Sequence, residues 1–142
     1  MSRSTGRSRV APEGWTTVVP RIVAQDARSL VEFVTRVFDA TGAYREDRPS
    51  DLRIGDSVLM ISDAGIRQPT AAFLYVYVRD ADATYRRALE AGARSLEDPM
   101  DTPYGDRRCM LEDRWGNTWQ IATYKAPKAR RRPKRRARRS RA

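Results

Sequence analysis

Residues 102–124, TPYGDRRCMLEDRWGNTWQIATY, are predicted to form a β-hairpin from which the rest of the fold can be built outward. Residues 107–112 mix apolar and charged side chains at the period of a strand, and residues 118–123 alternate in the same way. Between them, residues 113–117 (DRWGN) contain the glycine and asparagine that are typical of a tight turn. Two antiparallel strands are therefore expected to close the folded part of the chain.

The second strand of this hairpin carries the first candidate for a functional residue. Trp119 and Ile121 share one face of the strand, whereas Thr118, Gln120 and Ala122 share the other. In a cupped sheet the Gln120 amide would face the cavity, where a single polar group could contact a ligand. The alternative interpretation, in which Gln120 faces solvent on an antiparallel sheet, stays open.

The composition excludes several classes of site. The chain has 142 residues, of which 40% are hydrophobic, so it is long enough to bury the core of one domain. It has no histidine and one cysteine, Cys109, which excludes an internal disulfide, thiolate metal clusters within one chain, and Ser-His-Asp or Cys-His catalytic triads. Cys109 follows Arg107 and Arg108, so it is either a reactive thiol beside cations or inert filler on a strand.

The net charge of +10 is distributed unevenly along the chain. Residues 1–12 contain 3 Arg and residues 125–142 contain 11 Lys or Arg, both without acidic residues, whereas residues 13–124 contain 14 Arg against all 18 acids. We interpret these segments as a disordered basic leader, a disordered basic tail and the folded domain. No apolar run approaches the roughly 18–20 residues that span a bilayer, and no signal-peptide-like stretch is present, which predicts a cytoplasmic protein.

Two amphipathic helices are predicted, each introduced by an aspartate. Asp26 precedes a helix of about 14 residues that Gly42 is expected to end, and Asp80 precedes a helix through Ala91 that Gly92 is expected to end. Besides the hairpin, strands are expected at residues 17–24, 44–47, 51–54, 57–62, 73–78 and 95–97.

The order strand, helix, strand, strand, strand thus occurs twice. Residues 23–27 and 54–60 of the first copy align with residues 77–81 and 115–121 of the second. Each copy has too little apolar surface to be stable alone, so the two copies should pack together.

The predicted fold class is therefore α+β. Tandem βαβββ modules, residues 13–66 and 67–124, would form a cupped mixed or antiparallel sheet with the helices outside. A ferredoxin-like fold is the alternative, although it places only two strands between its helices where three are expected here, besides the strand that begins the second module.

Four short motifs in combination carry a resemblance to a known family: Pro20–Ala27 (PRIVAQDA), Leu52–Ser57 (LRIGDS), Pro103–Arg107 (PYGDR) and Asp113–Trp119 (DRWGNTW). With the doubled βαβββ pattern, they make residues 14–124 resemble the vicinal-oxygen-chelate superfamily, which includes glyoxalase I, bleomycin-resistance proteins and extradiol dioxygenases. The resemblance implies the fold, and it leaves the function open between the branches of the superfamily.

Metalloenzymes of this superfamily hold a divalent ion with His, Gln or Glu residues from the first and last strands of each module. By the resemblance, these positions fall near Val19, Leu59, Phe73 or Tyr75, and Gln120. Three of the four positions are apolar or aromatic, and one amide oxygen cannot hold such an ion. We therefore expect no metal and no cofactor, unless a shift in register brings in Asp51, Asp63 or Glu112.

The metal-free branch of the superfamily binds a ligand in the cup without transforming it. The resemblance then implies a homodimer that binds a small hydrophobic or aromatic molecule, for example to sequester a toxic or antibiotic compound, and no residue is assigned a catalytic role. The predicted ligand-binding residues are Val19, Arg21, Leu59, Phe73, Tyr75, Arg108 and Gln120.

Two alternatives stay open beside this interpretation. The aromatic side chains could be core filler. The protein could also be a glyoxalase-like lyase or an isomerase, with Glu112, Asp51 or Tyr104 as the base.

The tail suggests a further function. A run of Lys and Arg attracts phosphate backbones without recognising sequence, so the tail could bind nucleic acid non-specifically. The predicted contacts are Arg130, Arg131, Arg132, Lys134, Arg135 and Arg136. The alternative is a solvated extension without a partner.

Overall fold

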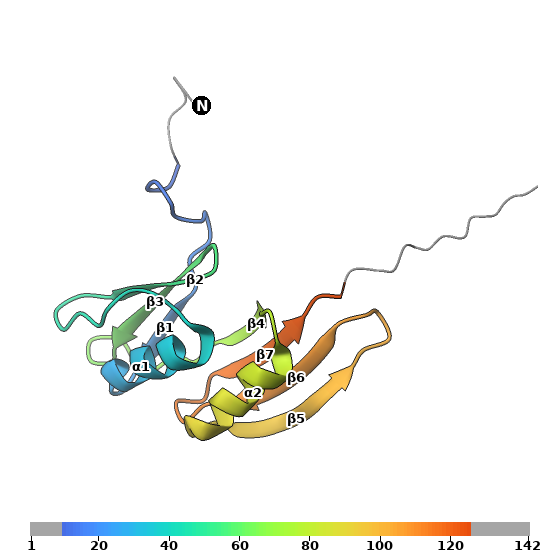
Figure 1. Cartoon of the computed structure of the whole chain (residues 1–142). Helices are drawn as coiled ribbons and strands as arrows, with labels where there is room; N and C mark the ends of the chain where they lie inside the picture. Colours follow the sequence, from blue (N-terminus) through green and yellow to red (C-terminus); the bar gives the residue numbers. More distant parts are fainter. Residues whose placement is uncertain (1–9, 126–142) are drawn as a thin grey trace, which may run out of the picture.

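The computed structural model describes residues 10–125, and both the predicted tail contacts and most of the predicted leader lie outside this range. The predicted α+β fold class is confirmed, with two modules side by side (Figure 1). The first module contains β1 (Arg21–Ala24), α1 (Ala27–Phe38), β2 (Ser50–Ile54) and β3 (Ser57–Asp63). The second contains β4 (Phe73–Tyr77), α2 (Ala81–Glu90), β5 (Arg94–Asp101), β6 (Arg107–Glu112) and β7 (Thr118–Thr123).

Each module folds into its own mixed sheet. The first sheet has the strand order β1-β3-β2 and the second has the order β4-β7-β6-β5. In both, the strand before the helix pairs in parallel with the last strand of the module, and the remaining pairs are antiparallel. The internal repeat seen in the sequence is therefore also a structural repeat.

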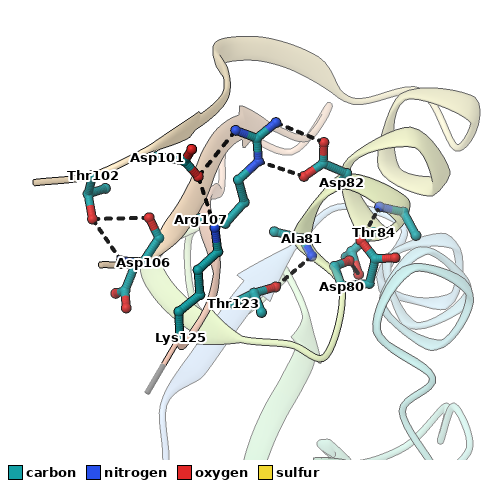
Figure 2. Close-up of polar contacts among 11 residues, drawn as sticks. Asp80, Ala81, Asp82, Thr84, Asp101, Thr102, Asp106, Arg107, Thr123 and Lys125 are labelled. Carbon is teal, nitrogen blue, oxygen red and sulfur yellow. Dashed lines mark hydrogen bonds and ion pairs between the residues drawn. The ribbon is translucent and has the colours of Figure 1, made fainter. Parts of the chain in front are cut away.

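The two helices begin in the same way. Asp26 and Asp80 are the N-caps, and their carboxylates accept hydrogen bonds from the backbone N–H groups of Ser29 and Ala83. The first N–H group of each helix is bound by the last strand of its module. Ala27 N donates to Asp63 Oδ1 over 3.0 Å, and Ala81 N donates to Thr123 Oγ1 over 2.7 Å (Figure 2). These bonds tie the start of each helix to its sheet.

Residues 44–47 do not form the predicted strand. The loop is held by side chains instead of by a β-ladder: the Tyr44 hydroxyl donates to Asp63 Oδ2, and the Arg45 backbone N–H donates to Ser50 Oγ over 2.7 Å. A single bridge between Thr41 and Arg53 connects this segment to β2. The first module consequently has two strands after its helix, whereas the second has three.

Two predicted boundaries in the first module are also wrong. The first strand begins at Arg21 rather than at residue 17, directly after Pro20, which has no N–H group for a ladder. The helix ends at Phe38 instead of extending toward Gly42. The next residue, Asp39, has a left-handed backbone conformation with φ of 57°. Gly42 serves a different purpose, because a Cβ atom there would lie 2.4 Å from the Asp51 carbonyl oxygen of the adjacent strand.

In the second module the predicted elements are confirmed, with β5 extending beyond the predicted residues 95–97 through two register shifts. Among residues 10–125, neither helix is long and apolar enough to cross a membrane.

One hydrophobic core joins the two modules. Trp119 of the second sheet, with 1% of its surface exposed, packs against Phe38 of the first module at a centroid distance of 4.9 Å. Phe33 of α1 contacts the ring of Trp115, in the β6–β7 turn, at 6.1 Å. The first helix therefore covers part of the second sheet, and neither module buries its apolar surface alone.

The β6–β7 turn is organised by the buried carboxylate of Asp113. Its two oxygens accept hydrogen bonds from Trp115 N, Asn117 N, Asn117 Nδ2 and Trp119 Nε1, at 2.8 to 2.9 Å. The Asn117 side-chain oxygen in turn accepts from Ala72 N over 2.8 Å, which fixes the start of β4 beside β7. One carboxylate thus holds the turn and the tryptophan of the shared core.

Replacing Asp113 with alanine should lower the free energy of unfolding by about 3 kcal/mol, because four donors lose a charged acceptor in a buried place. Chemical denaturation measures the change. Asp56→Ala, in the exposed β2–β3 turn of the first module, is the matched control and should stay within about 0.5 kcal/mol of the original protein. Equal losses for the two variants would contradict this account of the turn.

Candidate ligand-binding face of the second sheet

The four-stranded sheet has one covered face and one open face. Leu74 and Val76 of β4 pack against the core on the side of α2. The intervening residues Phe73, Tyr75 and Tyr77 point to the opposite side, with exposed fractions of 65%, 40% and 60%. We call this opposite side the inner face. Three large aromatic side chains are thus exposed along one edge strand.

Four of the seven predicted ligand-binding residues lie on the inner face. Tyr75 pairs with Gln120 across β4 and β7, and Phe73 lies two residues before Tyr75 on the same strand. Arg108 pairs with Ala122, which shares the face of Gln120. Within residues 10–125 the half-buried Gln120 amide makes no hydrogen bond, so its donor and acceptor are both available. The alternation noted in the sequence correctly separates Gln120 from the buried Trp119 and Ile121.

Asp106, in the loop between β5 and β6, is the most enclosed polar group near this face, with 5% of its surface exposed. Its Oδ2 atom accepts hydrogen bonds from the Tyr75 hydroxyl over 3.1 Å and from the Tyr77 hydroxyl over 3.3 Å. Thr102 holds the backbone of Asp106 through its own hydroxyl, over 2.9 Å to N and 3.1 Å to O (Figure 2). The loop therefore delivers a fixed carboxylate to two exposed tyrosines.

The tyrosines of this cluster remain protonated over the physiological range. Burial, followed by the hydrogen bond to Asp106, raises the pKa of Tyr75 well above its usual value. Burial and the charge of Asp106 raise the pKa of Tyr77 in the same direction. Each hydroxyl therefore keeps a proton to donate to the carboxylate.

Arg108 is held beside this cluster by an ion pair. Its Nε atom lies 3.1 Å from Glu97 Oε1, and its Nη1 atom donates to the Tyr104 hydroxyl over 2.7 Å. Its neighbour Arg107 points to the other side of the sheet, where it binds both carboxylate oxygens of Asp82 on α2, over 2.9 and 3.1 Å (Figure 2). The two arginines thus serve opposite faces, as expected for consecutive residues of a strand.

Cys109 follows them on the covered side, and its surface is fully buried. Burial raises the pKa of this thiol to about 12, so the thiolate is scarce at neutral pH. The structure favours the inert interpretation of this residue.

The other three predicted ligand-binding residues lie in the first module, and one of them, Leu59, shares a cleft with the inner-face residue Tyr75. Val19 is half-buried in the segment before β1. Leu59 is a buried core residue that also lines a cleft of about 310 Å³ with Tyr75 and Trp119. Arg21 donates to Ser62 Oγ over 3.0 Å in a separate charged cleft of about 400 Å³, near Arg48, Asp63 and Arg67.

Sequence reasoning missed Tyr77 and Asp106. A signal for Tyr77 was present, because it continues the alternation of Phe73 and Tyr75 along β4. No local pattern could identify Asp106, which contacts residues about 30 positions away in the sequence.

The residues at the superfamily's metal positions do not fit a divalent ion. Gln120 and Tyr75 share the inner face, but Val19 and Leu59 belong to the first module and have no donor atoms in their side chains. Across residues 10–125, no group of three or more His, Cys, Asp or Glu side chains is arranged to hold a metal ion. The donor set that a metal-dependent member of the superfamily needs is therefore missing from this part of the chain.

The proposed bases of the lyase alternative are all engaged. Glu112 forms an ion pair with Arg94. Asp51 forms one with Arg45, with Oδ2 lying 3.3 Å from Nη1. The Tyr104 hydroxyl accepts its hydrogen bond from Arg108. Each of the three therefore already has a partner in the described part of the chain.

Two helix-backed modules that share one core, with an open aromatic sheet face, have the architecture of vicinal-oxygen-chelate proteins. Residues 15–121 match the model of the Glyoxalase/Bleomycin resistance protein/Dioxygenase superfamily, and the chain belongs to this family. The recognition made from the four sequence motifs is thereby confirmed.

Similar proteins include an uncharacterised protein of Mycobacterium tuberculosis strain H37Rv, 30% identical over 120 residues, which are 72% of this chain and 71% of the relative. Among solved structures, TioX from Micromonospora sp. ML1 has a TM-score of 0.65 at 23% identity, covering 76% of this chain and 98% of that one. A family enzyme from Burkholderia phytofirmans PsJN has a TM-score of 0.65 at 20% identity, covering 75% and 97%. At these identities the likeness to the solved structures shows the fold alone.

Proposed function

We propose that this protein binds a planar aromatic small molecule on the inner face without transforming it, and so sequesters a toxic or antibiotic compound in the cytoplasm. The observation that carries the proposal is the meeting of Phe73, Tyr75, Gln120 and Arg108 on one open sheet face. Aromatic walls with a few fixed polar groups are typical of small-molecule sites.

The polar groups on this face suit recognition better than chemistry. The Gln120 amide can both donate and accept a hydrogen bond, and it has no partner in the described residues. Arg108 and Tyr104 bind each other, so they are positioned before a ligand arrives. The family's metal positions lack a donor set, which favours its metal-free, bleomycin-resistance-like branch for this chain.

A homodimer is part of the proposal. The aromatic side chains of β4 form an exposed apolar patch, and such patches often mark an interaction surface. In addition, β4 and β1 are both edge strands of their sheets. A second copy of the chain, placed over the inner face by a two-fold axis, would cover the aromatic side chains and turn an open face into an enclosed cup.

The ligand site can be tested with naphthamide, a neutral planar probe, by fluorescence titration of the full-length protein. Tyr75→Ala and Gln120→Ala should each weaken binding, by about tenfold for Tyr75→Ala, because the ring contributes a stacking surface. Leu89→Ala is the matched control, because Leu89 is 39% exposed on α2, outside the inner face. Unchanged affinity in Tyr75→Ala and Gln120→Ala would refute the site.

The dimer can be tested by analytical ultracentrifugation, which should give twice the 16.2 kDa mass of the chain. Phe73→Asp should raise the dimer dissociation constant at least about tenfold, because it introduces a charge into the covered surface. Leu89→Asp introduces the same charge on α2 and should leave the dimer intact. A monomeric original protein at micromolar concentration would contradict this part of the proposal.

Non-specific nucleic-acid binding by the tail is a second candidate function, favoured by the confinement of 11 Lys and Arg to residues 125–142 beside an acidic domain. Deleting residues 126–142 keeps the pair between Lys125 and Asp101 but should abolish retention on DNA at low salt. The affinity of the full chain for DNA should fall steeply as the salt concentration rises. In a plot of log affinity against log salt concentration, each neutralised phosphate should make the negative slope steeper by about 0.9.

A variant that preserves chain length replaces the six predicted contacts with glutamine. These are Arg130, Arg131, Arg132, Lys134, Arg135 and Arg136. It should weaken retention nearly as much as the deletion. Equal retention of the full-length and shortened proteins would eliminate the tail as a nucleic-acid-binding segment.

A further inference from the structure

We propose that the inner face selects aromatic ligands that carry a protonated nitrogen, with Tyr75, Tyr77 and Asp106 as the group that recognises the cation. The inference rests on the proposed function, because it names the chemical class of ligand for the same face. It derives from a buried negative charge that the described residues do not neutralise.

Asp106 makes no ion pair with any residue of 10–125, although it is almost fully enclosed. Its Oδ2 atom accepts from two tyrosine hydroxyls, and its Oδ1 atom has no hydrogen-bond partner in this range. A carboxylate that is removed from water without a cation is unfavourable, unless hydrogen bonds or a bound ligand compensate for it. The two hydroxyl donors are neutral and bring no positive charge to it.

The cations near Asp106 are already bound to other acids. Arg108 pairs with Glu97 on the inner face. Arg107 and Lys125 bind Asp82 and Asp101, and neither makes an ion pair with Asp106 (Figure 2). The charge of Asp106 is therefore left without a cation in this cluster of paired groups.

The hydrogen bonds to Asp106 also fix what the tyrosines present to a ligand. Both hydroxyl protons point toward the carboxylate, because an ionised carboxylate is an acceptor only. The outward side of each tyrosine oxygen then carries lone pairs alone. A ligand meets hydrogen-bond acceptors beside a negative charge, and a group that donates N–H bonds matches them.

The two rings add a second preference for cations. Tyr75 and Tyr77 lie with their centroids 5.2 Å apart and their planes at 54°, so they form a bent aromatic wall. The faces of such rings attract positive charge, most strongly where water is excluded. A planar amidinium or a protonated amino-heteroaromatic compound can stack on the wall and direct its N–H groups to the tyrosine oxygens. A carboxylate or phosphate would meet acceptors and a like charge.

A matched series of three naphthalene probes tests this inference on the full-length protein. At neutral pH, naphthamidine is a cation, naphthamide is neutral and naphthoate is an anion, while the ring is the same. Fluorescence titration should show naphthamidine binding about tenfold more tightly than naphthamide, and naphthoate binding more weakly than both.

Three variants connect the preference to the proposed group. Asp106→Asn removes the charge, and Tyr77→Phe keeps the ring but removes the exposed hydroxyl; both should reduce the ratio of naphthamidine to naphthamide affinity toward one. Tyr77→Phe is the variant to interpret if Asp106→Asn fails to fold. Glu90→Gln removes one negative charge from the exposed end of α2 and should leave the ratio unchanged.

The outcomes separate this inference from the proposed function. Equal binding of naphthamide and naphthamidine, or a cation preference that survives in both Asp106→Asn and Tyr77→Phe, would overturn the inference and leave the aromatic site standing. Failure of all three probes to bind the original protein would overturn the aromatic site and the inference together.

Discussion

The burial of Trp119 between the two modules is the constraint on which the rest of the structure depends. Its indole N–H donates to the buried Asp113 carboxylate over 2.8 Å, and its ring packs on Phe38 of the first helix. A shift of β7 by one residue would place Gln120 in the core and Trp119 on the open face. The same contact that joins the modules therefore determines which side chains face a ligand.

The sequence alone predicts the elements whose hydrophobic period is regular and whose ends carry a recognisable turn or capping residue. The alternation of residues 107–112 and 118–123 predicted both hairpin strands with their correct bounds, and Asp26 and Asp80 predicted the two helix starts. The prediction failed at residues 44–47, where Tyr44 bonds to Asp63 across 19 positions of sequence. A short polar segment of that kind takes its structure from a distant partner, which local propensity does not contain.

The residues of the candidate site also differ in whether the sequence could predict them. Phe73, Tyr75, Arg108 and Gln120 were accessible to sequence reasoning because each one's face follows from strand alternation once the register is known. Asp106 was not accessible, because its role arises only when a loop brings it beside β4. Val19 was assigned through the family's strand positions, and Arg21 was proposed as a polar contact of the cup. The structure places both in the first module, Val19 before β1 and Arg21 at its first residue.

The electrostatic character of the inner face is determined by the β5–β6 loop, which contains Asp106, rather than by the strands. On β6, each charged side chain has a partner of opposite sign, as Arg108 has Glu97 and Glu112 has Arg94, so the strand itself presents little net charge to a ligand. Asp106 adds one carboxylate that accepts its hydrogen bonds from tyrosines. Because loops vary more freely than strands, a change in the β5–β6 loop can alter ligand preference while the aromatic wall and the shared core remain the same.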